Sequence, residues 1–198
     1  MRAVPRDAYP FLWLCGASGV GKSSVGWEIQ TQLTAEGVRN AYLDLDQIGW
    51  CRPAPVDDPD NHLIRASNLG AMWANFRNAG ARCLVISGCV DTEDEVRLYA
   101  DAVADRTLTL CRLRVRPAEL RERIFVRGAG GGPVVPGDEI RGASHERLSR
   151  QADEAMANGN DLDRAGLGHL IVDTDGVPVV EVVRRVRSLA GHWPSLRS

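Results

Sequence analysis

One segment of the chain has the residue types and the spacing of a phosphate-binding loop. Residues 16–23 are Gly-Ala-Ser-Gly-Val-Gly-Lys-Ser, which fits the pattern G-x-x-x-x-G-K-S. Lys22 is the only lysine among the 24 lysine and arginine residues of the protein. Arginine does not substitute for lysine where a compact ammonium must fit among phosphate oxygens. The segment therefore predicts a site for the phosphate tail of a nucleoside triphosphate.

The positions of this loop have separate predicted roles. Its glycines let the chain turn tightly, so that main-chain N–H groups and the positive end of the following helix face the phosphates. We expect the Lys22 ammonium to reach the β- and γ-phosphates, and the Ser23 hydroxyl to ligate Mg²⁺. The predicted nucleotide-binding residues here are Gly16, Ala17, Ser18, Gly19, Val20, Gly21, Lys22, Ser23 and Ser24.

Two carboxylates follow the next apolar run, residues 41–45. Asp44 and Asp46 stand at the expected carboxyl end of a strand, which is where open α/β sheets bind ligands. Asp46 is the preferred general base for an acceptor hydroxyl, and Asp44 is expected to assist it and to hold Mg²⁺ through water. Which of the two is the base stays open. The alternative is that both only cap the turn after the strand.

Apolar runs alternate with amphipathic segments along the chain. The runs at 11–15, 41–45, 83–87, 108–115 and 169–173 predict strands, and the segments at 21–36, 62–78, 92–105, 117–127, 144–158 and 177–189 predict helices. This order predicts one α/β domain over residues 1–198, with a parallel sheet covered on both faces. Trp73 and Phe76 are expected in the core. Arg112, Arg114 and Arg116 alternate along one strand, which indicates that the strand leaves the sheet near Arg114.

Composition narrows the classes of partner. The net charge is −2, so a nucleic acid would need a local arginine patch, and we regard it as an unlikely partner. No apolar run is long enough to span a membrane, and the N-terminus has no hydrophobic signal core. Five scattered cysteines form no disulfide framework or zinc pattern. We expect a cytoplasmic protein, and a homodimer stays open.

Three classes of phosphate-loop protein compete. A regulatory GTPase needs an N-K-x-D element, which is absent, although residues 46–49 match a D-x-x-G switch. A transport or motor ATPase needs a strand that ends in Asp-Glu, whereas the run at 84–86 ends in Ser87 and Gly88. A small-molecule kinase fits the length best. A nucleotide-dependent regulator without a small-molecule acceptor remains the main alternative, and a polynucleotide or protein kinase is disfavoured because no basic groove is visible.

The loop at 16–24 and the segment Leu43-Asp44-Leu45-Asp46-Gln47-Ile48 together resemble the P-loop kinases of small molecules. The likeness is greatest to adenylylsulfate kinase, whose second strand ends in Asp-Gly-Asp, and gluconate kinase, shikimate kinase and chloramphenicol phosphotransferase share the plan. Leu45, Gln47 and Ile48 depart from the adenylylsulfate kinase pattern, which argues against that substrate. The resemblance implies a three-layer sandwich around a five-stranded parallel sheet of order 2-3-1-4-5. It also implies transfer of the γ-phosphate of ATP to a hydroxyl of a small molecule.

The resemblance further implies a mobile lid, placed at about residues 121–145, whose arginines close over the phosphates. Arg123 and Arg127 share a helix face and are the expected catalytic arginines, with Arg121 and Arg141 as further candidates. The alternative is a solvated basic face paired with glutamates. Residues 173–176 resemble the loop that contacts the adenine ring in related kinases, so Asp175 and Gly176 are expected beside that ring. The alternative is that these residues form only a turn.

The acceptor is expected beside the carboxylates. Residues 49–76 would form the wall of its pocket, with the candidates Trp50, Arg52, His62, Arg65 and Asn68. Ser87, Gly88 and Asp91 follow the third strand and would lie beside the phosphate loop. A metabolite, nucleoside, sugar or antibiotic-like compound would each fit these residues.

Overall fold

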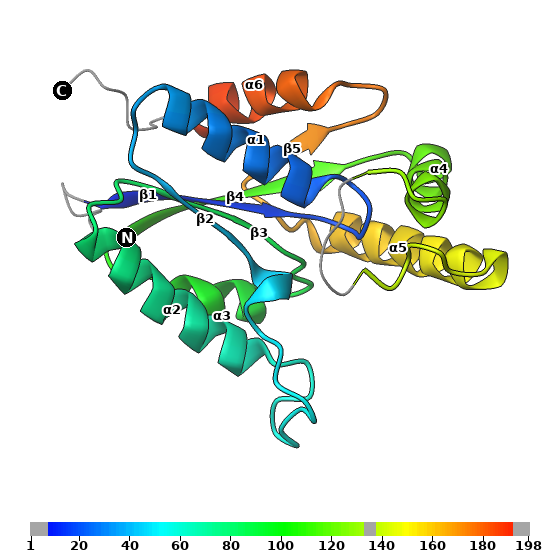
Figure 1. The fold of residues 1–198 in the computed structure, drawn as a ribbon, viewed down its shortest axis with the longest axis horizontal. Helices are drawn as coiled ribbons and strands as arrows, with labels where there is room; N and C mark the ends of the chain where they lie inside the picture. The colour runs from blue at the N-terminus through cyan, green and yellow to red at the C-terminus, as the bar shows by residue number, and fades with distance from the viewer. Residues whose placement is uncertain (1–7, 133–137, 192–198) are drawn as a thin grey trace.

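The computed structural model describes residues 8–132 and 138–191, and its centre is a parallel sheet (Figure 1). The five strands lie in the order β2-β3-β1-β4-β5, which confirms the predicted order. Their bounds are β1 (Tyr9–Cys15), β2 (Ala41–Asp44), β3 (Leu84–Ser87), β4 (Arg106–Arg114) and β5 (Leu170–Asp173).

Helices cover both faces of the sheet, because a helix follows each strand along the chain and packs back on the sheet. The helices are α1 (Lys22–Ala35), α2 (His62–Asn78), α3 (Glu93–Ala102), α4 (Pro117–Gly128), α5 (His145–Ala165) and α6 (Val179–Ala190). In Figure 1, α1 and α6 lie on one face and α2 and α3 on the other. Helices α4 and α5 lie beside the carboxyl ends of the strands.

The core consists of two apolar clusters, one on each face of the sheet. Strand β1 is buried from Phe11 to Cys15 and supplies side chains to both clusters, as expected of a central parallel strand. Trp73 is buried, and Phe76 packs against the same cluster, so both predicted core residues are confirmed.

Two helices end at least three residues from their predicted bounds. The helix predicted over 144–158 continues to Ala165, although Asn158, Gly159 and Asn160 are poor helix formers. Burial of Leu162 against the sheet offsets that weak propensity. The third helix ends at Ala102 instead of residue 105.

Strand β4 ends at Arg114, as the alternating arginines indicated. No helix within the described ranges, 8–132 and 138–191, combines the length and the apolar character that crossing a membrane requires. The expected lid, at about residues 121–145, includes residues 133–137, which lie outside the described residues, so its mobility stays a prediction.

Candidate active site

The phosphate-binding loop links β1 to α1 and turns on three glycines with positive φ. Gly16, Gly19 and Gly21 have φ values of 130°, 86° and 102°, a region that side-chain-bearing residues rarely adopt. A Cβ atom on Gly16 would lie 2.4 Å from the carbonyl oxygen of Leu113 in β4. The loop therefore passes too close to the neighbouring strand for any residue except glycine at position 16.

Lys22 folds back into this loop from the first turn of α1. Its Nζ donates to the carbonyl oxygens of Gly16 and Ala17, both at 2.9 Å, and the residue is 8% exposed. Burial acts to lower the pKa of Lys22, but the nearby Cys89 and Asp46 side chains outweigh it, so the pKa is raised. A charged ammonium therefore lies at the centre of the loop.

Ser23 and Asp44 meet across the gap between α1 and β2. The Ser23 hydroxyl donates to Asp44 Oδ2 at 2.7 Å, and the Ser87 hydroxyl of β3 donates to the same oxygen at 3.0 Å. The other carboxylate oxygen of Asp44 accepts the Asp46 N–H at 3.0 Å, at the start of the short 3₁₀ helix Leu45–Gln47. These three bonds fix the Asp44 carboxylate beside the loop.

Tyr42 lies behind this carboxylate and was not among the predicted site residues. Its hydroxyl is 2.8 Å from Ser87 Oγ. Because Ser87 donates to Asp44, Tyr42 is the donor of that bond. Burial raises the pKa of Tyr42 to about 12, so the hydroxyl keeps its proton. A sequence signal existed, because Tyr42 precedes Asp44 by two residues and shares its strand face.

A cleft of about 1400 Å³ opens in front of these groups. It is lined by residues 18–25, by Arg116 and one side of α4, by residues 131, 132 and 138, by the segment from Thr174 to the start of α6, and by Asp44, Asp46, Gln47, Trp50 and Cys89. After their predicted roles, we call residues 18–25 with the segment from Thr174 to the start of α6 the nucleotide half, and Asp44, Asp46, Gln47 and Trp50 the acceptor half.

Asp46 and Trp50 form one wall of the acceptor half. Asp46 is exposed, and the indole Nε1–H of Trp50 donates to its main-chain oxygen. The Trp50 side chain is largely free of other packing, because the residue is 59% exposed. The structure therefore brings Asp46 and Trp50 together at the edge of the cleft.

Arg123 and Arg127 both line the cleft, and both are held by carboxylates. Arg123 pairs with Glu119 at 2.6 Å and also donates to the main-chain oxygens of Val20 and Thr174. Arg127 pairs with Asp138 at 2.9 Å. The Asp138 side chain is 4% exposed; burial acts to raise the pKa of Asp138, but the bonds from Arg127 and Ile140 outweigh it and lower the pKa.

The other two candidate arginines lie elsewhere. Arg121 pairs with Asp153 of α5 at 2.8 Å and is not among the residues that line the cleft. Arg141 donates to the main-chain oxygens of Gly130, Gly131 and Gly132. Arg141 thus stabilises the conformation of residues 130–132 through their carbonyl oxygens.

Residues 173–176 contribute to the nucleotide half in an uneven way. The Gly176 N–H donates to both Glu119 oxygens, at 3.0 and 2.9 Å, and this bond is the main cause of the lowered pKa of Glu119. Gly176 and Thr174 line the cleft. The Asp175 carboxylate instead accepts the N–H and the Nε–H of Arg116 and faces a second cavity.

Of the predicted acceptor residues, the structure places Trp50 in the cleft and Ser87 against Asp44. His62 bonds to Tyr99, and Asn68 donates to the Ile48 carbonyl oxygen. The remaining candidates, Arg52, Arg65, Gly88 and Asp91, are also not among the lining residues.

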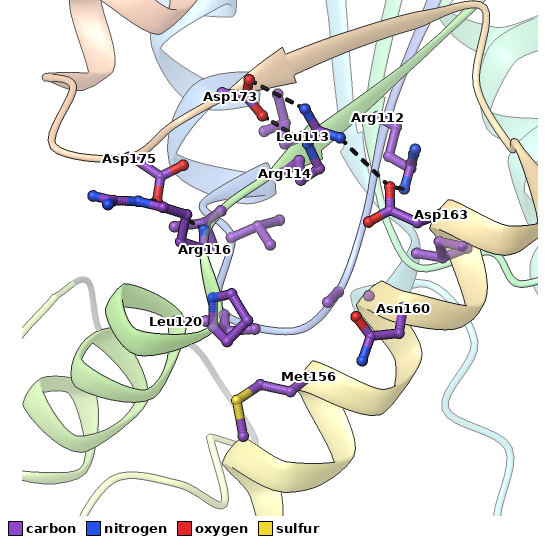
Figure 2. Close-up of a pocket in the computed structure, with 16 residues that line it drawn as sticks. Arg112, Leu113, Arg114, Arg116, Leu120, Met156, Asn160, Asp163, Asp173 and Asp175 are labelled. Atoms are coloured by element: carbon purple, nitrogen blue, oxygen red, sulfur yellow. Dashed lines mark hydrogen bonds and ion pairs between the residues drawn. The ribbon is translucent and has the colours of Figure 1, made fainter.

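Figure 2 shows the second cavity, of about 340 Å³, between the carboxyl end of β4 and helices α4 and α5. Its three arginines are paired in sequence order: Arg112 with Asp163 at 2.7 Å, Arg114 with Asp173 at 2.7 Å, and Arg116 with Asp175 at 2.8 Å. Arg112 is 3% exposed, and the carboxylate from α5 explains how a charged residue can be buried in β4.

The oxygen donors of the cleft fit Mg²⁺ when a phosphate tail completes the set. Within residues 8–132 and 138–191, no cluster of three His, Cys, Asp or Glu side chains could hold a metal by itself. A hydroxyl and a carboxylate 2.7 Å apart, beside a phosphate cradle, suit a hard cation that keeps several waters and phosphate ligands. Ser23 would ligate directly, and Asp44 would hold a water ligand.

No family model and no curated protein matches the sequence. Similar folds do occur among solved structures. A gluconokinase from Sinorhizobium meliloti is 20% identical, with a TM-score of 0.58 and 93% of each chain covered. A tunicamycin resistance protein from Deinococcus radiodurans is 17% identical, with a TM-score of 0.61, over 93% of this chain and 97% of that one. The APS kinase of Mycobacterium tuberculosis, solved with AMPPNP and APS, is 17% identical, with a TM-score of 0.54, over 93% and 99%.

These structures share the architecture of the P-loop small-molecule kinases. The predicted resemblance to that fold is thereby confirmed, together with the predicted strand order. At 17–20% identity the likeness establishes the fold and leaves the reaction to be argued from the site.

Proposed function

We propose that the protein is an ATP- and Mg²⁺-dependent phosphotransferase that moves the γ-phosphate to a hydroxyl of a small molecule. The observation that carries this proposal is the Lys22 ammonium, held in a glycine loop at the floor of a cleft that also contains Asp44 and Asp46. Phosphoryl transfer requires positioning and neutralisation of charge more than covalent help from the protein.

The nucleotide half would bind ATP through main-chain groups and one cation. N–H groups of residues 16–24 and the N-terminus of α1 would surround the phosphates. Lys22 would exchange its bonds to Gly16 and Ala17 for phosphate oxygens. Gly176 and its neighbours would contact the adenine ring. Arg123 would hold this part of the cleft in place, because it donates to the main-chain oxygens of both Val20 and Thr174.

The metal site would use Ser23 and Asp44. Bound Mg²⁺ supplies charge neutralisation between the β- and γ-phosphates. The chain itself would orient the metal ligands. Ser87 and the Asp46 N–H each donate to one oxygen of Asp44 and thereby hold this carboxylate beside the loop.

Asp46 would orient the acceptor hydroxyl and take its proton. Its carboxylate lines the cleft and is in no ion pair with a described residue, whereas Asp44 is held by Ser23 and Ser87. This difference favours Asp46 over Asp44 as the base. Arg127 would complete the charge clamp if phosphate oxygens replaced Asp138 as its partner.

A nucleotide-dependent regulator without an acceptor is the alternative. A protein without an acceptor does not require the acceptor half, in which a carboxylate and an exposed indole line the same cleft as the phosphate loop. The size of the cleft, about 1400 Å³, also exceeds the 300–1,000 Å³ usual for one small ligand. Both observations favour two bound molecules.

The proposal is tested by following the γ-phosphate of labelled ATP with a panel of hydroxylated metabolites, sugars, nucleosides and antibiotics. We expect one class of acceptor to become labelled, with Asp46→Asn lowering kcat by about 10² to 10⁴-fold while ATP still binds. Asp57→Asn, in an exposed loop position away from the cleft, is the matched control. Full transfer by Asp46→Asn would remove Asp46 as the base, and partner-stimulated hydrolysis without labelled acceptor would favour the regulator.

A further inference from the structure

An ion pair on α4 joins two segments that lie far from it, and from each other, in the sequence. Glu119 and Arg123 pair at 2.6 Å within the helix, and both residues line the cleft. Arg123 donates to Val20 of the phosphate loop, and Glu119 accepts the N–H of Gly176 in the segment after β5. The phosphate loop and the segment from Thr174 to Gly176, expected at the adenine ring, therefore meet at this one pair.

The terminal nitrogens of Arg123 are fully engaged by the protein. Nη1 donates to the carbonyl oxygen of Val20 at 3.2 Å and to the hydroxyl of Thr174 at 3.0 Å. Nη2 donates to Glu119 Oε1 and to the carbonyl oxygen of Thr174, both at 2.6 Å. These four bonds occupy the four terminal N–H groups of the guanidinium. A phosphate group can therefore bind the end of this side chain only by displacing an acceptor of the protein.

Glu119 holds the other end of this network. The N–H of Gly176 lies 3.0 Å from one oxygen of Glu119 and 2.9 Å from the other. A hydrogen bond to a charged carboxylate is stronger than one between neutral groups. The Glu119 side chain is 23% exposed and that of Arg123 is 28% exposed, so water screens the pair less than it screens an ion pair on the open surface. Glu119 therefore fixes the main chain at Gly176.

Thr174 makes a second connection between the same two segments. The residue is 3% exposed, and its N–H donates to the carbonyl oxygen of Arg114 in β4 at 2.8 Å. Its hydroxyl lies 3.2 Å from that oxygen and 3.4 Å from the carbonyl oxygen of Val20. Thr174 and Arg123 thus both contact Val20, which stands among the glycines of the phosphate loop. The network sets the position of the Thr174–Gly176 segment relative to this loop.

We propose that Glu119 and Arg123 are positioning residues that hold the Thr174–Gly176 segment at a fixed distance from the phosphate loop, so that the base and the phosphates of one nucleotide bind together. This inference rests on the proposed function only in placing ATP in this cleft. It removes Arg123 from the arginines that touch phosphate and leaves Arg127 for that role. Because a preformed site loses less freedom on binding, the pair contributes to the affinity for whole ATP and not to the affinity for a phosphate tail alone.

The test compares the affinities for ATP and for inorganic tripolyphosphate, both with Mg²⁺. Calorimetry gives the two dissociation constants, and competition with labelled ATP gives the second one if tripolyphosphate binds weakly. We expect Glu119→Ala to weaken ATP binding at least about tenfold and tripolyphosphate binding less than about threefold. Glu119→Gln should be intermediate, because its amide oxygen still accepts the N–H of Gly176 but carries no charge for Arg123.

A double variant tests whether the two residues act through one network. Arg123→Met alone should weaken ATP binding at least about tenfold, like Glu119→Ala. The variant with both changes should bind ATP within about twofold of the weaker single variant, because residues of one network are not additive. The matched control is the pair of Glu36 and Arg187, at 2.6 Å, which joins α1 to α6 outside the cleft lining. Glu36→Ala should leave both affinities unchanged.

Each contrary result has a separate meaning. Equal weakening of ATP and tripolyphosphate in Arg123→Met shows that Arg123 touches the phosphates, which overturns the inference. A lower unfolding temperature of Glu119→Ala with an unchanged ratio of the two affinities shows a merely structural pair and also overturns it. So does equal affinity of the natural protein for ATP and tripolyphosphate. ATP binding without transfer to any acceptor refutes the proposed function alone, and absence of ATP binding refutes both.

Discussion

At the scale of single residues, the site depends on one ammonium. Lys22 is the only lysine of the chain, so an amine-selective reagent can modify only Lys22 and the α-amino group. We expect saturating ATP with Mg²⁺ to slow acylation of Lys22 at least about tenfold, because phosphates cover the ammonium. Mass spectrometry follows the two amines separately, and the α-amino group is the internal control. Adenosine lacks phosphates and should give no protection; equal protection by adenosine and ATP would contradict the assigned role.

A second residue-scale prediction concerns the hydrogen bonds behind Asp44. Ser87→Ala removes one of the donors that orient the carboxylate, and Tyr42→Phe removes the donor to Ser87. We expect the Mg²⁺ concentration for half-maximal activity to rise about tenfold in Ser87→Ala and less in Tyr42→Phe. The KM for ATP at saturating Mg²⁺ should change little, since neither side chain is expected to touch the nucleotide.

Tyr9→Phe is the matched control for this pair, because Tyr9 packs on Trp73 far from the loop. A loss of kcat at all Mg²⁺ concentrations, without a shift in the Mg²⁺ dependence, would show that Ser87 acts by another route. Ser87→Thr keeps a hydroxyl at this position. If its Mg²⁺ concentration for half-maximal activity equals that of the natural protein, the result would support the role of Ser87 in orienting Asp44.

At the scale of elements, a partly buried ion pair joins β4 to α5. Arg112 is 3% exposed, and Asp163, its partner at 2.7 Å, is 44% exposed. Asp163→Ala leaves a buried guanidinium without its carboxylate. We expect a loss of roughly 2 kcal/mol, below the 3–5 kcal/mol typical of fully buried pairs because water reaches Asp163. Thermal unfolding should move down by about 4–8 °C.

Asp161→Ala on the same helix is the control for this measurement. Asp161 pairs with Arg164 at the surface, where such pairs contribute little, so its removal should cost less than about 1 kcal/mol. Equal destabilisation by the two alanine variants would contradict the assignment of the Arg112 pair.

The elements were predictable to the extent that local sequence determines them. The five strands and the first turn of α1 follow from apolar runs and from the glycine spacing at 16–21, and the helix 62–78 has the predicted bounds. Long-range partners were not predictable. Nothing local to Arg112 indicates Asp163, 51 residues away, and Asn158-Gly159-Asn160 indicates a helix end that tertiary packing overrides.

The site was predictable in the same uneven way. Lys22, Ser23, Asp44 and Asp46 stand at positions that the fold brings together at the strand ends, and the structure places them in one cleft. Their assigned roles remain predictions. Tyr42 and Asp138 were not among the predicted site residues, because each acts through a bond to a side chain on another element.

At the scale of the whole molecule, buried thiol and phenol groups determine how the free energy of unfolding changes at alkaline pH. Burial raises the pKa of Cys15, Cys83 and Cys111 from 9.0 to about 12, and that of Tyr42 and Tyr99 from 10.0 to about 12. The unfolded chain releases these protons near pH 9–10, whereas the folded protein retains them. The stabilisation is therefore complete below pH 9 and is lost as pH rises toward 12.

Urea unfolding between pH 7 and pH 11 measures this effect. We expect a free energy of unfolding that is steady from pH 7 to 8.5 and then falls with a slope that steepens above pH 9. Cys111→Ala should make the fall shallower, because one buried thiol no longer contributes. A stability independent of pH up to 11 would contradict the burial of these groups.

The central claim is that residues 16–23 bind the phosphates of a nucleotide around Lys22. Calorimetric titration of ATP in the presence of Mg²⁺ tests it most directly, with Lys22→Ala titrated in parallel. The account predicts saturable binding by the natural protein and affinity weakened at least about a hundredfold in Lys22→Ala. No binding of ATP, or equal affinity in the two proteins, would contradict it.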